Sequence, residues 1–276
     1  MQDNSQQIEF WNGPSGERWA ALNETTERSL SFITAALMPF AAAKPGERVL
    51  DVGCGCGATT LALAQAVGPT GLGRGIDISR PMLEAARRRA KGNGEIAFIE
   101  ADAARYHFEP EYDLVFSRFG VMFFADPAGA FANIRCALTP GGRLIFVCWR
   151  ALQDNGWAAG PLASAMDLLP SQPPVEPHAP GPFAFADRDR LLAILASAGF
   201  RDPKADALDT LMNMGATLED AVAAALSIGP LSRATMELDD AARDTVRGRV
   251  RGILAEFETP AGICPPAACW LVSARA

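Results

Sequence analysis

The sequence contains little histidine and no CxxC pair of cysteines, which argues against a bound metal ion. Only two of its 276 residues are histidines, His107 and His178, and none of its six cysteines forms a CxxC pair. Zinc sites usually draw their ligands from such pairs and from histidines. We therefore expect no metal site, and we interpret the cysteines as reduced thiols of a cytoplasmic protein.

Long runs of positive charge and long apolar runs are also missing. The 25 lysines and arginines are outnumbered by 32 acidic residues, giving a net charge of −7, so no nucleic-acid partner is expected. No apolar run is long enough to cross a bilayer. The first ten residues have neither the basic region nor the apolar region of a signal peptide. The sequence therefore predicts a cytoplasmic protein without a membrane span.

What the sequence does contain is a regular alternation of apolar and helical segments over residues 45–150. Hydrophobic residues make up 49% of the chain, which is enough for one large core and a single domain over residues 1–276. Short apolar segments predict strands at residues 48–52, 72–77, 95–100, 112–117 and 143–149. Helical patterns lie between them at residues 58–67, 79–91 and 126–138, the second with Ser79 as the expected N-cap. Strands that alternate with helices indicate a parallel sheet covered on both faces.

The segments outside residues 45–150 are expected to surround one edge of that sheet. Residues 1–44 are interpreted as an N-terminal helical arm, with short helical pieces first and a helical segment over residues 23–43. Residues 151–186 are rich in proline and show no clear period, so they are predicted to form a long loop. The remaining elements are a helix at 187–198, a strand within 204–211, two alanine-rich helices within 213–260, and a last strand at 267–274.

A glycine-rich loop joins the first predicted strand to the first predicted helix. Gly53, Gly55 and Gly57 lack a Cβ, which allows a sharp turn and a close approach to a ligand. Asp77 ends the second strand twenty residues later, where an acid in this architecture accepts hydrogen bonds from ribose hydroxyls. Together these features predict a nucleotide-like ligand. The alternative is a tight turn without a ligand, with Asp77 as a helix-capping or solvated acid.

These segments resemble the motifs of the class I S-adenosylmethionine-dependent methyltransferases, especially their UbiE-like small-molecule branch. Residues 51–57 look like the first motif, 75–79 like the acidic end of the second strand, 100–103 like the adenine-binding segment, 112–117 like the fourth strand, and 138–144 like the turn into the fifth. The resemblance covers residues 45–150 and is weak at both ends of the chain. It implies a Rossmann-like, doubly wound, mostly parallel seven-stranded sheet with an antiparallel last strand, plus helical lid elements.

The resemblance also implies which residues bind the cofactor, S-adenosylmethionine, and its product, S-adenosylhomocysteine. Gly53 and Gly55 would pass close to the methionine part, and Asp51 would lie near its ammonium group, directly or through water. Asp77 would hold the ribose diol. The other implied contacts are Ile78 packing on the adenine, Asp102 accepting from its amino group, Ala103 near a ring nitrogen, and Ser117 facing the methionine or the acceptor.

A dinucleotide is the rival cofactor, because residues 53–58 also fit a G-x-G-x-x-A pattern. Asp51 argues against it, since a carboxylate there would repel phosphates but suits a cofactor with an ammonium and a sulfonium group. No tyrosine–lysine pair or other hydride-transfer set is evident, and the only tyrosines are Tyr106 and Tyr112. We therefore favour the methyl donor.

The acceptor pocket is expected above the carboxyl ends of the strands, beneath a lid made of the arm, the loop 151–186 and the insertion 213–260. The insertion is interpreted as a substrate cap, and the alternative is a dimer surface in a homodimer. His178 in the loop is the candidate general base, with an exposed loop histidine as the alternative. The candidate acceptor-binding residues are Trp11, Trp19, Arg118, Arg150 and Trp157. The tryptophans alternatively pack the lid on the core, and the arginines alternatively pair with lid carboxylates.

The sequence thus predicts an enzyme that transfers a methyl group from S-adenosylmethionine to a small-molecule acceptor by direct in-line displacement. Such a reaction depends mainly on alignment of the reactants, which can contribute about 7–11 kcal/mol. The alternatives are a non-catalytic module that binds S-adenosylmethionine and a nicotinamide-dependent oxidoreductase. The acceptor is not identified by these motifs, because the lid rather than the core selects it.

Overall fold

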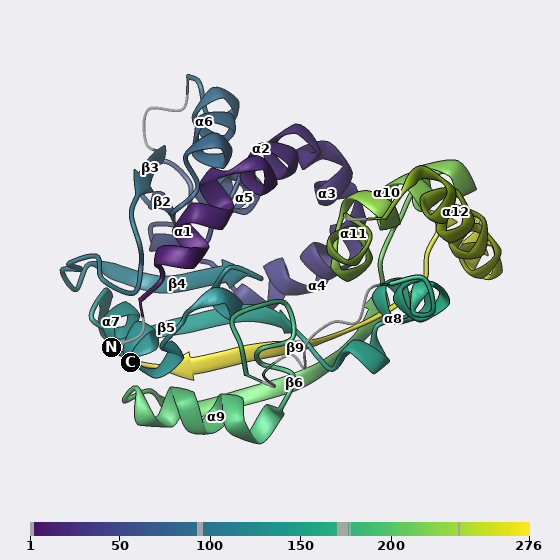
Figure 1. Ribbon diagram of the computed structural model, residues 1–276. Coiled ribbons are helices and arrows are strands. Elements are labelled where there is room, and N and C mark those ends of the chain that lie inside the picture. The colour runs from purple at the N-terminus through teal and green to yellow at the C-terminus, as the bar shows by residue number, and fades with distance from the viewer. Residues whose placement is uncertain (1–2, 93–95, 170–175, 177, 237) are drawn as a thin grey trace.

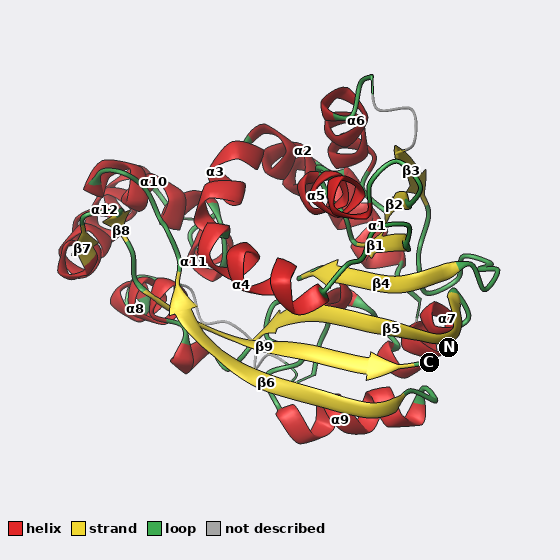
Figure 2. Cartoon of the chain, turned by 180° about the vertical axis from the view of Figure 1, so that it is seen from behind, coloured by secondary structure: helices red, strands yellow, loops and turns green. Residues whose placement is uncertain are grey.

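The computed structural model describes residues 3–92, 96–169, 176, 178–236 and 238–276. A seven-stranded sheet runs through the middle of the molecule (Figures 1 and 2). In spatial order its strands are β3 (Ile96–Glu100), β2 (Leu72–Asp77), β1 (Arg48–Val52), β4 (Tyr112–Arg118), β5 (Leu138–Trp149), β9 (Pro266–Arg275) and β6 (Arg201–Leu211). The predicted seven-stranded α/β fold is confirmed.

Strand direction changes only at one end of the sheet. The strands β3, β2, β1, β4 and β5 are parallel to their neighbours, whereas β9 runs antiparallel to both β5 and β6. The last strand is therefore inserted between two earlier ones, and the predicted antiparallel last strand is confirmed. Four of the five β1 residues are buried, which explains why this segment is a continuous apolar run.

Helices cover both faces of the sheet (Figure 2). On one face α4 (Ser31–Ala41) lies against β5 and β6, and α5 (Ala58–Val67) lies against β1 and β2. On the other face α7 (Pro127–Arg135) and α9 (Arg188–Ser197) pack against each other. The helix α6 (Arg80–Arg89) flanks β3. The parallel sheet therefore has the double covering that its apolar strands require.

The N-terminal arm is helical but more broken than predicted. It consists of α1 (Ser5–Asn12), α2 (Pro14–Ala21), α3 (Asn23–Ser29) and α4. The segment 23–43 is helical over most of its length, as predicted, but Leu30, with φ −90° and ψ 5°, separates α3 from α4. No glycine or proline marks this point, so tertiary packing sets the break. It separates α4, which packs on the sheet, from the three helices beyond the sheet edge (Figure 1).

The predicted long loop at residues 151–186 is wrong in its first part. A short turn, η2 (Leu152–Asp154), is followed by α8 (Gly156–Ala165). The buried residues of α8 are Trp157, Ala158, Pro161 and Ala165, which lie on one face of the helix. The rest of α8 carries no charged residue to contrast with that face, and Gly160 and Pro161 are poor helix formers, so the sequence pattern did not reveal it. Residues 170–175 and 177 lie outside the described residues.

The insertion 213–260 forms most of a separate group of helices, here called the helical cap. It contains α10 (Leu218–Ser227), α11 (Pro230–Ala234) and α12 (Asp240–Leu254), and α8 joins it by packing against α11 and α12. The short α11 and a two-stranded hairpin, β7 (Glu258–Thr259) with β8 (Gly262–Ile263), were not predicted. Figure 1 shows the helical cap beyond one end of the sheet, facing α3 across the molecule.

Candidate cofactor and acceptor site

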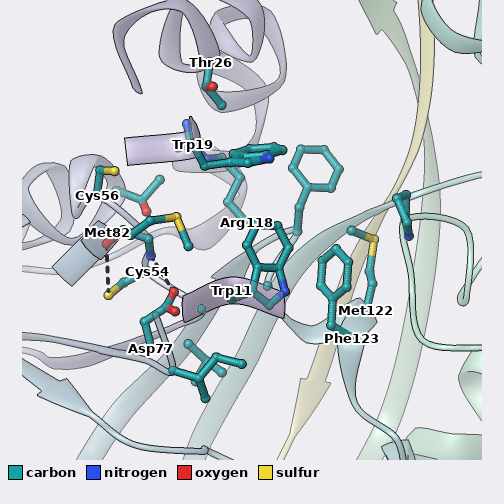
Figure 3. Close-up of a pocket in the computed structure, with 18 of the residues that line it drawn as sticks. Trp11, Trp19, Thr26, Cys54, Cys56, Asp77, Met82, Arg118, Met122 and Phe123 are labelled. Atoms are coloured by element: carbon teal, nitrogen blue, oxygen red, sulfur yellow. Dashed lines mark hydrogen bonds between the residues drawn. The ribbon is translucent and has the colours of Figure 1, made fainter. Parts of the chain in front are cut away.

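A cavity of about 220 Å³ lies at the carboxyl ends of β1, β2 and β4. Side chains from all three predicted lid segments line it: Trp11 from the arm, Trp157 from α8, and Ile228 from the insertion. Figure 3 shows Trp11, Trp19 and Asp77 around this space. The cavity thus has one side built by the sheet core and another built by the lid.

In the glycine loop, the backbone of Gly53 approaches the segment after β4 so closely that a side chain would not fit. Gly53, Gly55 and Gly57 have φ values of 67°, 53° and 78°, in the left-handed region that favours glycine. A Cβ on Gly53 would lie 2.5 Å from the Cα of Gly120, which follows β4. Gly53 and Gly55 line the cavity. Gly53 and Gly55 therefore present backbone to a ligand, while Cys54 and Cys56 of the same loop also line the cavity.

Asp77 holds the glycine loop while facing the cavity. Its Oδ2 accepts a hydrogen bond from the Gly55 amide at 2.8 Å, and its Oδ1 accepts one from the Ser79 amide at 2.8 Å. Burial raises the pKa of this carboxyl, although the backbone hydrogen bonds oppose the shift. A carboxylate offers about four lone-pair sites, so Asp77 retains acceptor capacity for ligand hydroxyls.

Asp51 is buried beneath the same loop with half of its carboxylate unused. Thr59 and Thr60 each donate a hydroxyl hydrogen bond to its Oδ2 at 2.7 Å. Its Oδ1 is buried and has no hydrogen-bond partner among the described residues. Burial raises the pKa of Asp51 to about 6, against the effect of the two threonines. An orphaned buried oxygen is costly, and a cationic ligand group would satisfy it.

Asp102 lies at the far end of the cavity and contacts the arm. Its Oδ1 accepts hydrogen bonds from the Ala104 amide and from the Asn4 side chain, both at 2.9 Å. The Oδ1 of Asn4 in turn accepts from the Ala125 amide at 2.9 Å. Asn4 thus links the start of the chain to two core loops. Sequence reasoning missed it, because nothing local to Asn4 indicates a partner 98 residues away.

The arm also caps the helix that follows Asp77. Ser79 occupies the N-cap position of α6 without making a side-chain capping bond, so its predicted capping role is wrong. Its hydroxyl instead donates to the Trp11 carbonyl at 2.7 Å. The Asn12 side chain accepts from the Arg80 amide at 2.9 Å and donates to the Ile78 carbonyl at 2.8 Å. The arm therefore supplies the cap and closes this side of the cavity.

Aromatic side chains form two groups in the wall of the cavity. Phe119 stacks on Trp149 with ring centroids 4.3 Å apart, and Trp149 contacts Trp157 at 4.9 Å. From the arm, Trp11 packs edge-on against Trp19 at 5.7 Å and against Phe123 at 5.4 Å. Trp11, Trp19 and Trp157 all line the cavity, as predicted for acceptor-binding residues.

Arg118 lines the cavity but is already paired with the arm. Its two terminal nitrogens donate to both carboxylate oxygens of Glu27, and one also donates to the Thr34 hydroxyl at 2.8 Å. Its side chain is only 10% exposed. The structure therefore matches the alternative in which this arginine pairs with a lid carboxylate. Glu27 itself was not predicted, because it is 91 residues from Arg118.

Four predicted site residues, Asp51 among them, are not among those that line the cavity. His178 is exposed, which matches its reading as an exposed loop histidine rather than a base. Arg150 pairs with Asp154 and Asp209 and packs over Trp270. Ser117 is fully buried, and its hydroxyl accepts from the Gly120 amide. The remaining predicted residues are brought together: Gly53, Gly55, Asp77, Ile78, Asp102 and Ala103 line the cavity, and Asp51 lies beneath it.

Unpartnered buried polar atoms concentrate around this cavity. Among the described residues four side-chain atoms are buried without a hydrogen-bond partner: Gln7 Oε1, Ser29 Oγ, Asp51 Oδ1 and Arg74 Nε. Gln7 and Ser29 line the cavity, and Asp51 supports its floor. Neither Gln7 nor Ser29 was predicted, since each lies on a helix without a motif. This concentration indicates a surface built to hydrogen-bond a ligand.

The described ranges contain neither a cluster of metal ligands nor a helix that could span a membrane. No three histidine, cysteine, aspartate or glutamate side chains there form a group that suits a metal ion. No helix in the described part of the chain combines the length and hydropathy needed to span a membrane.

Comparison with known proteins shows what this chain is similar to. A family model described as a methyltransferase domain matches residues 49–142. Aklanonic acid methyltransferase DauC from Streptomyces sp. (strain C5) is 41% identical over 104 residues, which is 37% of this chain and 47% of that protein. A demethylmenaquinone methyltransferase from Staphylococcus carnosus (strain TM300) is 31% identical over 170 residues, which is 58% of this chain and 70% of that protein. The chain thus spans about half the length of the first of these relatives.

A solved structure shares the fold over nearly the whole chain. Phosphoethanolamine N-methyltransferase 2 from Haemonchus contortus, in complex with S-adenosyl-L-methionine, matches with a TM-score of 0.59 at 18% identity. The match covers 97% of this chain and 59% of that one. At this identity the likeness shows a common architecture and not a common acceptor.

Proposed function

Because the chain belongs to the S-adenosylmethionine-dependent methyltransferase family, we propose that it transfers a methyl group from S-adenosylmethionine to a small molecule by direct in-line displacement. The observation that carries this proposal is a single cavity whose wall combines the glycine loop, Asp77 and aromatic side chains. The relatives named for aklanonic acid and demethylmenaquinone support a small-molecule acceptor.

The residues present fit the methionine and ribose parts of this cofactor. The unpartnered Oδ1 of Asp51 suits the ammonium group, directly or through water. The backbone of Gly53 and Gly55 leaves room beside it, because a Cβ is absent from both. The carboxylate of Asp77 is positioned by two backbone amides and retains lone pairs for the ribose hydroxyls.

The adenine would lie between Ile78 and the segment that follows β3. Ile78, Asp102 and Ala103 line that part of the cavity, and the Asp102 carboxylate would accept from the adenine amino group. Asn4 binds the same carboxylate from the arm. The arm would therefore cover the adenine and exclude water from it.

When bound, S-adenosylmethionine supplies a methyl group activated by the sulfonium. The residues of this chain contribute by fixing the two reactants and by covering the cavity, since alignment is the main requirement for such a transfer. The lining residues include no histidine. We therefore assign no general base to His178, and a dinucleotide is disfavoured because the Asp51 carboxylate would lie near its phosphates.

Other sequence-based expectations stay predictions. These are the division into arm (1–44), core (45–150), loop (151–186) and cap (213–260), the cytoplasmic location, and a homodimer. The helical cap and the arm both contribute lining residues, which supports a role in acceptor binding.

Transfer of a labelled methyl group tests this function. The protein is incubated with methyl-labelled S-adenosylmethionine and a panel of phenols, naphthols and quinols, and products are followed by mass spectrometry. We expect at least one labelled product from the wild type. The variant Asp77→Ala should form none. Binding of S-adenosylmethionine without transfer to any acceptor would favour the non-catalytic module.

A further inference from the structure

Ser29 carries an unused hydroxyl in the wall of the cavity. It is the last residue of α3, it is 1% exposed, and it lines the cavity. Its Oγ has no hydrogen-bond partner among the described residues. A serine in a helix usually satisfies its hydroxyl locally or with water, and burying it unpartnered is unfavourable. The position therefore suits a group that a ligand supplies.

The place of Ser29 in the fold separates it from the cofactor residues. Its carbonyl accepts a hydrogen bond from the Asn213 amide at 3.1 Å, and Asn213 follows β6 at one end of the sheet. Asp77 and Asp102 follow β2 and β3 at the opposite end. Ser29 also neighbours Leu30 and Met212, which line the cavity with it. The hydroxyl is thus on the side left for the acceptor.

Other polar side chains of the arm that line this region are already engaged. Asn23 donates to the Ala20 carbonyl, and Thr26 donates to the Leu22 carbonyl. Glu27 and Arg118 neutralise each other in a bidentate pair. None of these groups offers an uncompensated charge to an acceptor. Gln7, whose Oε1 is also unpartnered within the described part of the chain, lies on α1, and Asn4 just before α1 binds Asp102 on the cofactor side. Among the α3 side chains that line the cavity, Ser29 carries the unpartnered group.

The remainder of this half is aromatic and apolar. Phe119, Trp149 and Trp157 form a continuous set of ring contacts. The Trp157 indole nitrogen already donates to Asn155 at 3.1 Å. Aromatic walls favour flat apolar molecules through offset stacking and burial of apolar area. A single hydrogen-bonding group in such a wall would fix the orientation of the molecule.

We propose that Ser29 determines acceptor specificity by hydrogen-bonding one hydroxyl or carbonyl oxygen of an uncharged, flat, apolar acceptor. This inference rests on the proposed function, because it takes the Asp77 side of the cavity as the cofactor site. Ser29 contacts the acceptor and moves no proton in the reaction. An acceptor that carries a phosphate would find no unpaired cation among the described lining residues.

Matched probes test the role of Ser29. With S-adenosylhomocysteine bound, the affinities of 2-naphthol, naphthalene and 2-naphthyl phosphate are measured by tryptophan fluorescence. The wild type is expected to bind 2-naphthol about tenfold more tightly than either other probe, the usual scale of one hydrogen bond in an apolar site. In Ser29→Ala the 2-naphthol preference over naphthalene should fall below about twofold. Ser197→Ala, which removes an exposed hydroxyl on α9, should keep the wild-type preference.

The outcomes separate this inference from the proposed function. Absence of S-adenosylhomocysteine binding to the wild type would contradict the proposed function and this inference with it. Binding of S-adenosylhomocysteine with an unchanged 2-naphthol preference in Ser29→Ala would overturn the inference alone. Equal wild-type affinity for 2-naphthol and naphthalene, failure to bind any of the three probes, or tighter binding of the phosphate would do the same. Ser29→Ala should bind S-adenosylhomocysteine as the wild type does.

Discussion

Two glycines from distant segments meet at the floor of the cavity. Gly53 begins the turn after β1, and Gly120 follows β4. The two backbones approach so closely that a Cβ on either one would lie within 2.6 Å of the other. Sequence alone explains a glycine at position 53 through the turn. Only the structure shows that the contact with Gly120 also requires it.

Gly53→Ala is predicted to destabilise the protein by about 2 kcal/mol, because overpacking adds to the cost of positive φ. Gly141→Ala is the control. Gly141 also has a positive φ, 87°, but a Cβ there would contact nothing within 4 Å. Chemical denaturation measures both free energies of unfolding. Equal losses in the two variants would contradict the account of the Gly53–Gly120 contact.

The titration of Asp51 predicts how cofactor affinity depends on pH. Burial raises its pKa to about 6, so the carboxyl is mostly neutral at pH 5 and mostly ionised at pH 7. If the ionised form attracts the ammonium group, affinity for S-adenosylhomocysteine should rise about tenfold over this interval. Asp51→Asn should bind more weakly and lack this rise. Calorimetry at both pH values checks this, and an equal rise in the variant would assign the titration to another group.

The same shift has the opposite effect on folding. The folded protein binds the Asp51 proton more tightly than the unfolded chain does, whose pKa is near the ordinary 3.8. Asp51 therefore contributes stability below the unfolded pKa, and that contribution is lost as pH rises through about 6. The variant Asp51→Asn should lack this pH-dependent loss of stability. Denaturation experiments at different pH values measure it as the free energy of unfolding.

At the scale of elements, two asparagine side chains, and no recognisable sequence motif, connect the arm to the core. Asn12 caps α6 from outside that helix, and Asn4 bridges two core loops. These contacts hold α1 over the cavity. The position of the arm is therefore expected to depend on whether a ligand occupies the cavity.

Asn12→Ala is predicted to loosen the arm. Removal of the hydrogen bonds to Arg80 and Ile78, the first of them a helix cap, should cost about 1–2 kcal/mol locally. We expect faster hydrogen–deuterium exchange over residues 5–21 and several-fold weaker binding of S-adenosylhomocysteine. Ser5→Ala is the control, because among the described residues the Ser5 hydroxyl bonds to Asp3 alone. Unchanged exchange in Asn12→Ala would show that packing alone holds the arm.

The elements of the parallel core were predicted well from the sequence. The bounds of β1, α5 and β2 coincide with the predicted segments. The strand β5 begins at Leu138, five residues before the predicted start, because Leu138 still pairs with Tyr112 across a register shift. The helix α8 was missed because it has no charged face opposite its buried one and contains Gly160 and Pro161. Local patterns thus specify the core better than the lid.

At the scale of the whole molecule, the site joins residues that no local pattern connects. The cofactor side was predictable because its residues follow successive strands, and parallel strands end at one edge. The acceptor side depends on how the arm and the helical cap fold over that edge. That packing pairs Glu27 with Arg118 and positions Ser29 beside Asn213. This is why their roles were not evident in the sequence.

The most direct test of the central claim is calorimetric titration of the intact protein with S-adenosylhomocysteine, beside Asp77→Asn. The claim is that the Asp77 carboxylate, in a wall shared with the glycine loop, binds the ribose of the cofactor. The substitution by asparagine removes the negative charge and one hydrogen-bond acceptor but keeps the side chain at nearly the same size. The account predicts saturable one-to-one binding by the wild type and affinity at least about tenfold weaker in the variant, at similar melting temperature. Equal affinity in both proteins, or no binding by the wild type, would contradict it.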